Sequence, residues 1–197
     1  MNFLKTHSLP LFLLLTSLSL ALSSEFTTSY FRYERSSVID GELWRLLSAH
    51  LVHSGWEHLW LNLFALIIIW ILFKNFLTTS LWWLFTLLSA LYISISFFIF
   101  MNQLEWYVGL SGVLHSMMVF GSIAGLIHKR KEFLLLLIFI LAKVLFEQFY
   151  GSFSSDIIMA DSAVIVNAHM YGVIVGAIIG VVLWILNRQR LIKHRAD

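Results

Sequence analysis

The chain has 197 residues, of which 59% are hydrophobic and only 12% are charged, and its formal net charge is +2. Soluble domains carry about 25% charged residues, so this composition excludes an ordinary soluble domain and indicates an all-α, polytopic membrane protein. The absence of cysteine excludes disulfides and thiolate metal sites, and no basic run with interleaved aromatic residues suggests a nucleic-acid partner.

Six apolar segments follow one another along the chain. Each approaches the roughly 20 mainly apolar residues that cross a bilayer as a helix. The predicted spans cover about residues 9–22, 58–73, 81–100, 111–127, 133–149 and 164–186. We therefore predict a single membrane domain over residues 1–197, built as a bundle of six transmembrane helices.

Basic residues gather on one side of this six-span order. They are Lys5, Lys74, the cluster His128, Lys129, Arg130 and Lys131, and the final group Arg188, Arg190, Lys193 and Arg195. The opposite side holds the segment 25–57 and the two loops that carry acidic residues. Because positively charged flanks stay in the cytoplasm, both termini are predicted to be cytoplasmic.

The first apolar segment also has the features of a secretory signal peptide. Lys5 precedes it, and the small residues of "ALSS" at positions 21–24 follow it. Cleavage there would leave five spans without changing the orientation of the others. Both interpretations stay open on the sequence.

Polar side chains occur at membrane depth in three of the predicted spans. His58 and Asn62 are four residues apart, so they share one face of the second span. Ser111 opens the fourth span, and His169 lies about one turn into the sixth. All of them lie near the outer end of their span, and polar groups at this depth are functional by default. We therefore predict that they form one site.

Small residues allow the fourth and sixth spans to approach closely. If these helices dock, His169 comes within reach of the Ser111 hydroxyl, and a neutral imidazole beside a hydroxyl is a pair of general base and nucleophile. The sequence positions no acidic residue to orient His169, so we predict a Ser–His dyad without a third member. The glycines expected to support the packing are Gly109, Gly112, Gly172 and Gly176.

Each of these features also has a packing interpretation. A Gly-x-Ser-Gly string and a four-residue glycine spacing are typical of helix association. His58 and Asn62 would form an interhelical hydrogen bond in that case. His115 is either a core histidine or a ring that stacks against His169. The convergence of these groups at one depth favours the catalytic interpretation.

Two further pairs of ionisable residues lie outside this group. His50 and His53 are expected to be solvated in the loop before the second span. Lys143 and Glu147 have opposite charges and lie four residues apart on the fifth span, so they are expected to shield each other.

Three segments in order, "HLVHSGWEHLWLN", "GLSG" and "AHMYGVIVG", resemble the motifs of the rhomboid intramembrane serine proteases. The resemblance covers about residues 40–185. It implies that Ser111 is the nucleophile and His169 the base, and that His58 and Asn62 stabilise the oxyanion. It also implies a protein that works in lipid, without a cofactor or a metal, on substrates anchored by transmembrane helices.

The short form of the chain and the string "GLSGVLH" are similar to the rhombosortase branch of this family. In many rhomboids an aromatic residue four positions after the serine stacks on the base, and here His115 has that position. The branch implies a bacterial inner-membrane enzyme that opens to the periplasmic or outer side. Its expected substrates are single-span anchors of the C-terminal Gly-Gly type.

Other functions fit the sequence less well. A non-catalytic rhomboid-like protein that binds transmembrane helices would be marked by loss of the serine or the histidine, and both are present. An intramembrane metalloprotease needs a His-Glu-x-x-His string, which the chain lacks. A transporter would show an inverted repeat of interrupted spans, and none is visible.

Overall fold

The computed structural model describes residues 7–23, 25–151 and 165–196. In this part of the chain, six apolar helices form a bundle, and the predicted polytopic helical fold is confirmed. The helices are α2 (Ser8–Ala21), α6 (Trp56–Phe73), α7 (Thr79–Phe100), α8 (Ser111–Ile127), α9 (Glu132–Tyr150) and α10 (Val166–Ala196).

The helix bounds agree with the predicted spans except at the end of α10. Helices α6, α7, α9 and α10 are long and apolar enough to cross a membrane, whereas α2 and α8 are shorter apolar helices. Helix α10 continues to Ala196, ten residues past the predicted end of the sixth span. After Gly180 the sequence holds no glycine or proline, so the helix continues where the apolar segment stops.

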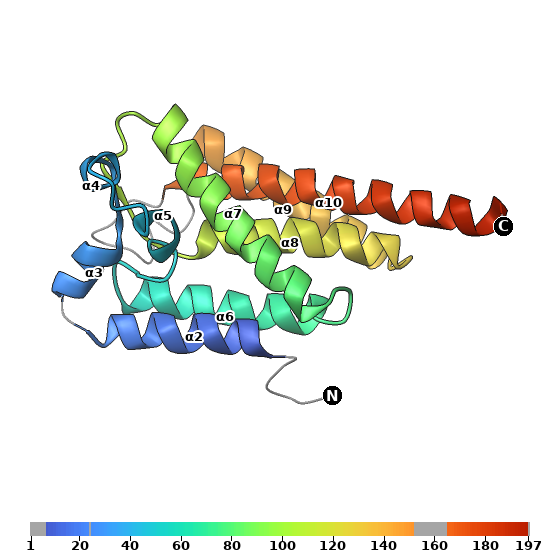
Figure 1. Cartoon of the computed structure of the whole chain (residues 1–197), viewed down its shortest axis with the longest axis horizontal. Coiled ribbons are helices and arrows are strands. Elements are labelled where there is room, and N and C mark those ends of the chain that lie inside the picture. Colours follow the sequence, from blue (N-terminus) through green and yellow to red (C-terminus); the bar gives the residue numbers. More distant parts are fainter. Residues whose placement is uncertain (1–6, 24, 152–164, 197) are drawn as a thin grey trace.

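The described connections alternate between the two ends of the bundle, as six spans require. Figure 1 shows the turns after α6 and after α8 at one end, and the connection between α7 and α8 at the other. The short helices α3 (Glu25–Phe31), α4 (Arg35–Ile39) and α5 (Arg45–Ser48) lie at this second end. The basic residues Lys74 and 128–131 thus lie at the end opposite the segment 25–57.

A two-stranded pair ties the segment 25–57 to the loop before α8. Strand β1 (Tyr33–Glu34) pairs antiparallel with β2 (Trp106–Tyr107). The Tyr107 hydroxyl donates to the carbonyl oxygen of Gly109 at 2.8 Å. The Gly109 N–H donates to the carbonyl oxygen of Ala49 at 3.0 Å. These hydrogen bonds hold the loop that precedes α8 in place, and with it the position at which α8 begins.

Helix α8 lies at the centre and packs most closely against α10. A Cβ atom added to Gly112 would lie 2.8 Å from the backbone oxygen of Ala168, and one added to Gly176 would lie 2.6 Å from that of Ser116. Both contacts are with backbone, which cannot swing away as a side chain can. The glycines therefore set the distance between the two helix axes.

Replacing Gly176 with valine is expected to lower the free energy of unfolding by about 1–3 kcal/mol, because the side chain overpacks the α8–α10 contact. The melting temperature of the detergent-solubilised protein measures this. Gly55→Ala is the matched control, since a Cβ there meets only Glu57, at 3.5 Å. Equal melting temperatures for the two variants would contradict a close contact between α8 and α10 at Gly176.

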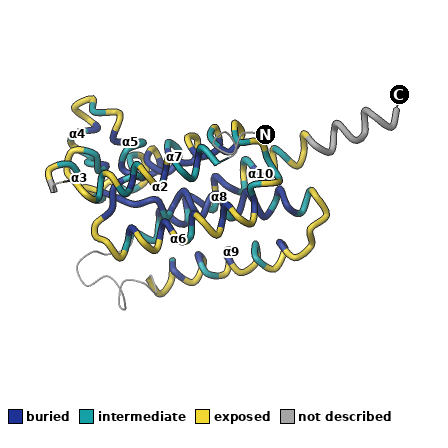
Figure 2. The backbone as a smooth tube through the Cα atoms, turned by 90° about the horizontal axis from the view of Figure 1, so that it is seen from below, coloured by how far each residue is buried: buried dark blue, intermediate teal, exposed yellow. Residues whose placement is uncertain are grey.

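Helix α9 packs on the edge of the bundle and leaves much of its surface exposed (Figure 2). Its inward face is a single stripe at helical spacing, formed by Phe133, Ile140, Val144 and Glu147. Glu147 thus belongs to the face that contacts α8 and α10. The carboxylate enters the bundle because it continues an apolar stripe.

Candidate active site

Ser111 and His169 lie side by side at the end of the α8–α10 contact where both helices begin. Ser111 Oγ is 3.0 Å from His169 Nε2, across 58 residues of sequence. Ser111 is the first residue of α8, and His169 lies in the first turn of α10. The close approach at Gly112 and Gly172 brings the two helix starts together. This distance permits direct proton transfer from the hydroxyl to the imidazole.

Glu147 of α9 lies on the other side of the imidazole ring. Its Oε2 is 2.9 Å from His169 Nδ1, and the residue is only 2% exposed. The expectation that no acidic residue orients His169 is therefore wrong. Glu147 and His169 are 22 positions apart in the sequence, and the sequence does not reveal their contact because it depends on how α9 is rotated against α10.

The contacts assign the proton of His169. A carboxylate only accepts hydrogen bonds, so His169 Nδ1 carries the hydrogen and donates it to Glu147. Nε2 is then the acceptor and faces the Ser111 hydroxyl. This is the tautomer that a general base needs.

Lys143 and His115 continue the network back to the serine. Lys143 Nζ donates to Glu147 Oε1 at 2.8 Å, which confirms the expected ion pair, and to His115 Nε2 at 2.9 Å. His115 Nδ1 donates to the backbone oxygen of Ser111 at 2.8 Å. Its ring stacks on that of His169, with 4.1 Å between the centroids and 21° between the planes. Five residues thus form a closed ring of hydrogen bonds.

The same cluster offers donor atoms of the kind that zinc binds. The ligand atoms of His115, Glu147 and His169 lie within 4.8 Å of one another. Lys143 Nζ, however, lies within hydrogen-bond distance of both Glu147 and His115. The ammonium group is therefore the cation that this carboxylate and imidazole hold in the described structure.

His58 lies against the loop that precedes Ser111. A Cβ atom on Gly109 would be 2.6 Å from the His58 ring, and Gly109 has φ of +119°, a conformation that favours glycine. Gly109 thus packs against α6 rather than against α10. Asn62 is buried one turn further along α6, and its amide donates to the His58 carbonyl oxygen at 2.9 Å. Of the two predicted oxyanion residues, His58 thus borders the loop, and Asn62 lies one turn away from it on α6.

His50 and His53 are buried, so the expectation that they are solvated is wrong. His50 Nε2 lies 3.1 Å from both the Ala90 carbonyl oxygen and Ser94 Oγ on α7. His53 packs edge-on against His58, with 5.0 Å between the ring centroids. Burial lowers the pKa of His50 to about 4 and that of His53 to about 3. The loop before α6 is therefore part of the packed structure that supports the site.

Because His50 is buried, we expect the free energy of unfolding to fall in acid. The unfolded residue has its ordinary pKa of 6.5 and the folded residue one of about 4, so the unfolded chain binds more protons between these values. The stabilisation is present above pH 6.5 and is lost as the pH falls towards 4. By pH 4.5 the loss should reach about 2–3 kcal/mol.

Melting temperatures at pH 7 and pH 4.5 test this. A His50→Asn variant lacks the titration, so its melting temperature should fall less than that of the wild type over this range. Equal falls in the two proteins would show that His50 is not the responsible group.

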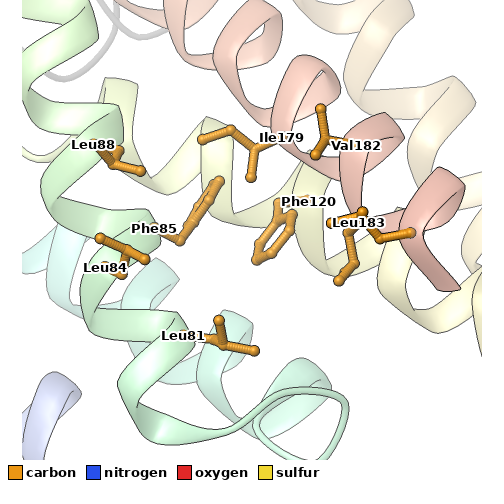
Figure 3. A pocket seen from close by; sticks show the side chains of 9 residues that line it. Leu81, Leu84, Phe85, Leu88, Phe120, Ile179, Val182 and Leu183 are labelled. Atoms are coloured by element: carbon orange, nitrogen blue, oxygen red, sulfur yellow. The ribbon is translucent and has the colours of Figure 1, made fainter.

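A cavity of about 170 Å³ lies away from these residues, between α7, α8 and α10 (Figure 3). It offers no acid, base or nucleophile, because its walls are entirely apolar. They are formed by Leu81, Leu84, Phe85, Leu88, Phe120, Ile179, Val182, Leu183 and Leu186.

The family model of the rhomboid domain matches residues 40–186, a range that contains all five members of the hydrogen-bonded ring. None of the curated proteins compared with the chain matches it.

Proposed function

Because the chain belongs to the rhomboid family of membrane proteins, we propose that it is an intramembrane serine endopeptidase. Members of this family are typically intramembrane serine proteases. The observation that carries the proposal is the 3.0 Å contact between Ser111 Oγ and His169 Nε2, with Glu147 on the far nitrogen of the same ring. A protein that only bound transmembrane helices would not need a hydroxyl, an imidazole and a carboxylate in this order.

The proposed reaction is acyl transfer to Ser111. Its Oγ attacks the carbonyl carbon of the scissile peptide bond while His169 Nε2 takes the hydroxyl proton. Glu147 stabilises the imidazolium that forms. When the carbon–nitrogen bond breaks, His169 gives this proton to the leaving amine. Water then attacks the acyl-enzyme, His169 takes a proton from the water, and Ser111 regains its hydrogen.

The oxyanion of each tetrahedral intermediate needs hydrogen-bond donors. We assign this role to the backbone N–H of Ser111 and to the side chains of His58 and Asn62. The His58 ring borders Gly109, two residues before the nucleophile. Ser111 is also the first residue of α8, where N–H groups have no partner within the helix. Such donors stabilise negative charge that develops on the substrate.

The proposed substrates are single-span membrane anchors, cut near the outer face of the membrane. Helical peptide bonds are shielded, so the substrate must unwind locally before the attack. Glycine costs about 1 kcal/mol relative to alanine in a helix, so a Gly-Gly pair eases unwinding. This is consistent with the Gly-Gly sorting anchors of the rhombosortase branch. In this proposal both termini are cytoplasmic, in a bacterial inner membrane.

Comparative proteomics tests the proposed substrates. Anchored proteins are compared in cells that carry the wild type or Ser111→Ala, and uncleaved anchors should accumulate only with the variant. A reporter with a C-terminal Gly-Gly, an apolar helix and a basic tail should be cut, and one with Leu-Leu in place of Gly-Gly should persist. Equal cleavage of both reporters would refute the Gly-Gly specificity without refuting the peptidase.

A further inference from the structure

Lys143, like His115, is a member of the ring that the proposed reaction does not use. It lies on α9, one turn before Glu147, and its side chain is 29% exposed. Its ammonium group donates to Glu147 Oε1 and to His115 Nε2. It therefore connects the carboxylate behind the base to the ring that stacks on the base.

The first consequence concerns charge. Glu147 is 2% exposed, and a buried carboxylate without a cation is strongly destabilising. The neutral tautomer of His169 supplies a hydrogen bond but no positive charge. Lys143 supplies that charge, so the resting site has a carboxylate, an ammonium and two neutral imidazoles, with no net charge.

The second consequence concerns the orientation of His115. Because the ammonium can only donate, His115 Nε2 must accept, and its hydrogen is then on Nδ1. That hydrogen bonds the backbone oxygen of Ser111. Both ring nitrogens are thereby held, and the ring lies flat against His169. In this way Lys143 fixes the orientation of the His115 ring, which stacks on His169.

We propose that Lys143 is a positioning residue for the base. It balances Glu147, so that His169 is neutral before the reaction, and it aligns His115 against His169. This inference rests on the proposed serine peptidase and deepens it. Without the ammonium, the cation that the described residues can still offer to the carboxylate is the His169 imidazolium, which cannot accept a proton from Ser111.

Labelling of Ser111 by a fluorophosphonate probe tests this role without knowledge of the substrate. Lys143→Met keeps an unbranched side chain and removes the charge. It should lower the maximal labelling rate about 10-fold or more and leave the probe concentration for half-maximal rate unchanged, because a lost alignment of groups slows reaction rather than binding. Lys131→Met, at an exposed lysine beside the start of α9, is the matched control and should label like the wild type.

The same substitution in a Glu147→Gln background separates positioning from a general structural role. With no carboxylate to balance, Lys143→Met should slow labelling by less than about threefold there, since residues that act as a unit are not additive. This double variant also keeps the test open if Lys143→Met alone folds poorly, because it leaves no unpaired buried charge. Circular dichroism and gel filtration in detergent give the folded fraction of each variant. Each labelling rate is normalised to this fraction.

Two results would overturn the proposed role of Lys143. One is wild-type labelling by Lys143→Met, and the other is an equal slowing in both backgrounds. Ser111→Ala distinguishes these from failure of the peptidase itself. If that variant still reacts with the probe, Ser111 is not the nucleophile, whatever the effect of Lys143.

Discussion

Replacing Ser111 with alanine is expected to abolish cleavage of a co-expressed single-span reporter, and His169→Ala is expected to do the same. The first variant removes the attacking oxygen, and the second removes the imidazole that lies 3.0 Å from it and accepts its proton. Loss of either member of such a pair in serine proteases lowers kcat by about 10⁶-fold, so cleavage should fall to background. Immunoblotting of the released ectodomain measures the effect.

Ser116→Ala is the matched control for this experiment. Ser116 is a buried serine of the same helix, and its hydroxyl donates to the Val113 carbonyl oxygen at 2.7 Å. The Ser116→Ala variant therefore removes a serine hydroxyl from α8 that makes no hydrogen bond to His169. Its activity should equal that of the wild type. Cleavage by Ser111→Ala at the wild-type rate, with the protein folded and present in the membrane, would eliminate the proposed mechanism.

The second large effect is expected for Glu147→Gln. Glutamine has nearly the same shape but no charge, so it neither stabilises the imidazolium nor balances Lys143. We expect kcat to fall on the order of 10²-fold with little change in KM, because the group acts through the base and does not touch the substrate. Both kcat and KM can be measured with purified enzyme and purified reporter in detergent.

The control for this variant is Glu132→Gln, at an exposed glutamate in the first turn of α9. It removes the same charge from the same helix, far from His169, and should leave both constants unchanged. If Glu147→Gln were as active as the wild type, His169 would work as a base without its carboxylate. The site would then be the dyad that the sequence suggests, and Glu147 would serve packing and charge balance alone.

The positions of the helices could be predicted from sequence because hydropathy and helical periodicity are local properties. The approach of α8 and α10 could also be predicted, because Gly172 and Gly176 create a narrow face on one side of α10. That face carries His169, and the matching start of α8 carries Ser111. The depth predicted for these two side chains follows from their positions within the apolar segments.

The packing of the loops could not be predicted in this way. His50 and His53 look like solvated residues because they precede a span in a polar stretch. The burial of His50 depends on contacts with α7 and with the loop before α8, which are remote in sequence. The link between β1 and β2, only two residues in each strand, has no pattern of its own.

By itself, the sequence determined that this is a membrane protein of six apolar helices with serine, histidine and asparagine at one depth. The tertiary structure decided which charged groups join them. Lys143 and Glu147 are visible in the sequence as an ion pair on one face of α9, but their role depends on the rotation of that helix about its axis. A turn of α9 in the other direction would direct both side chains away from the bundle. Packing of its apolar stripe against α8 and α10 holds Glu147 on His169 and Lys143 on His115.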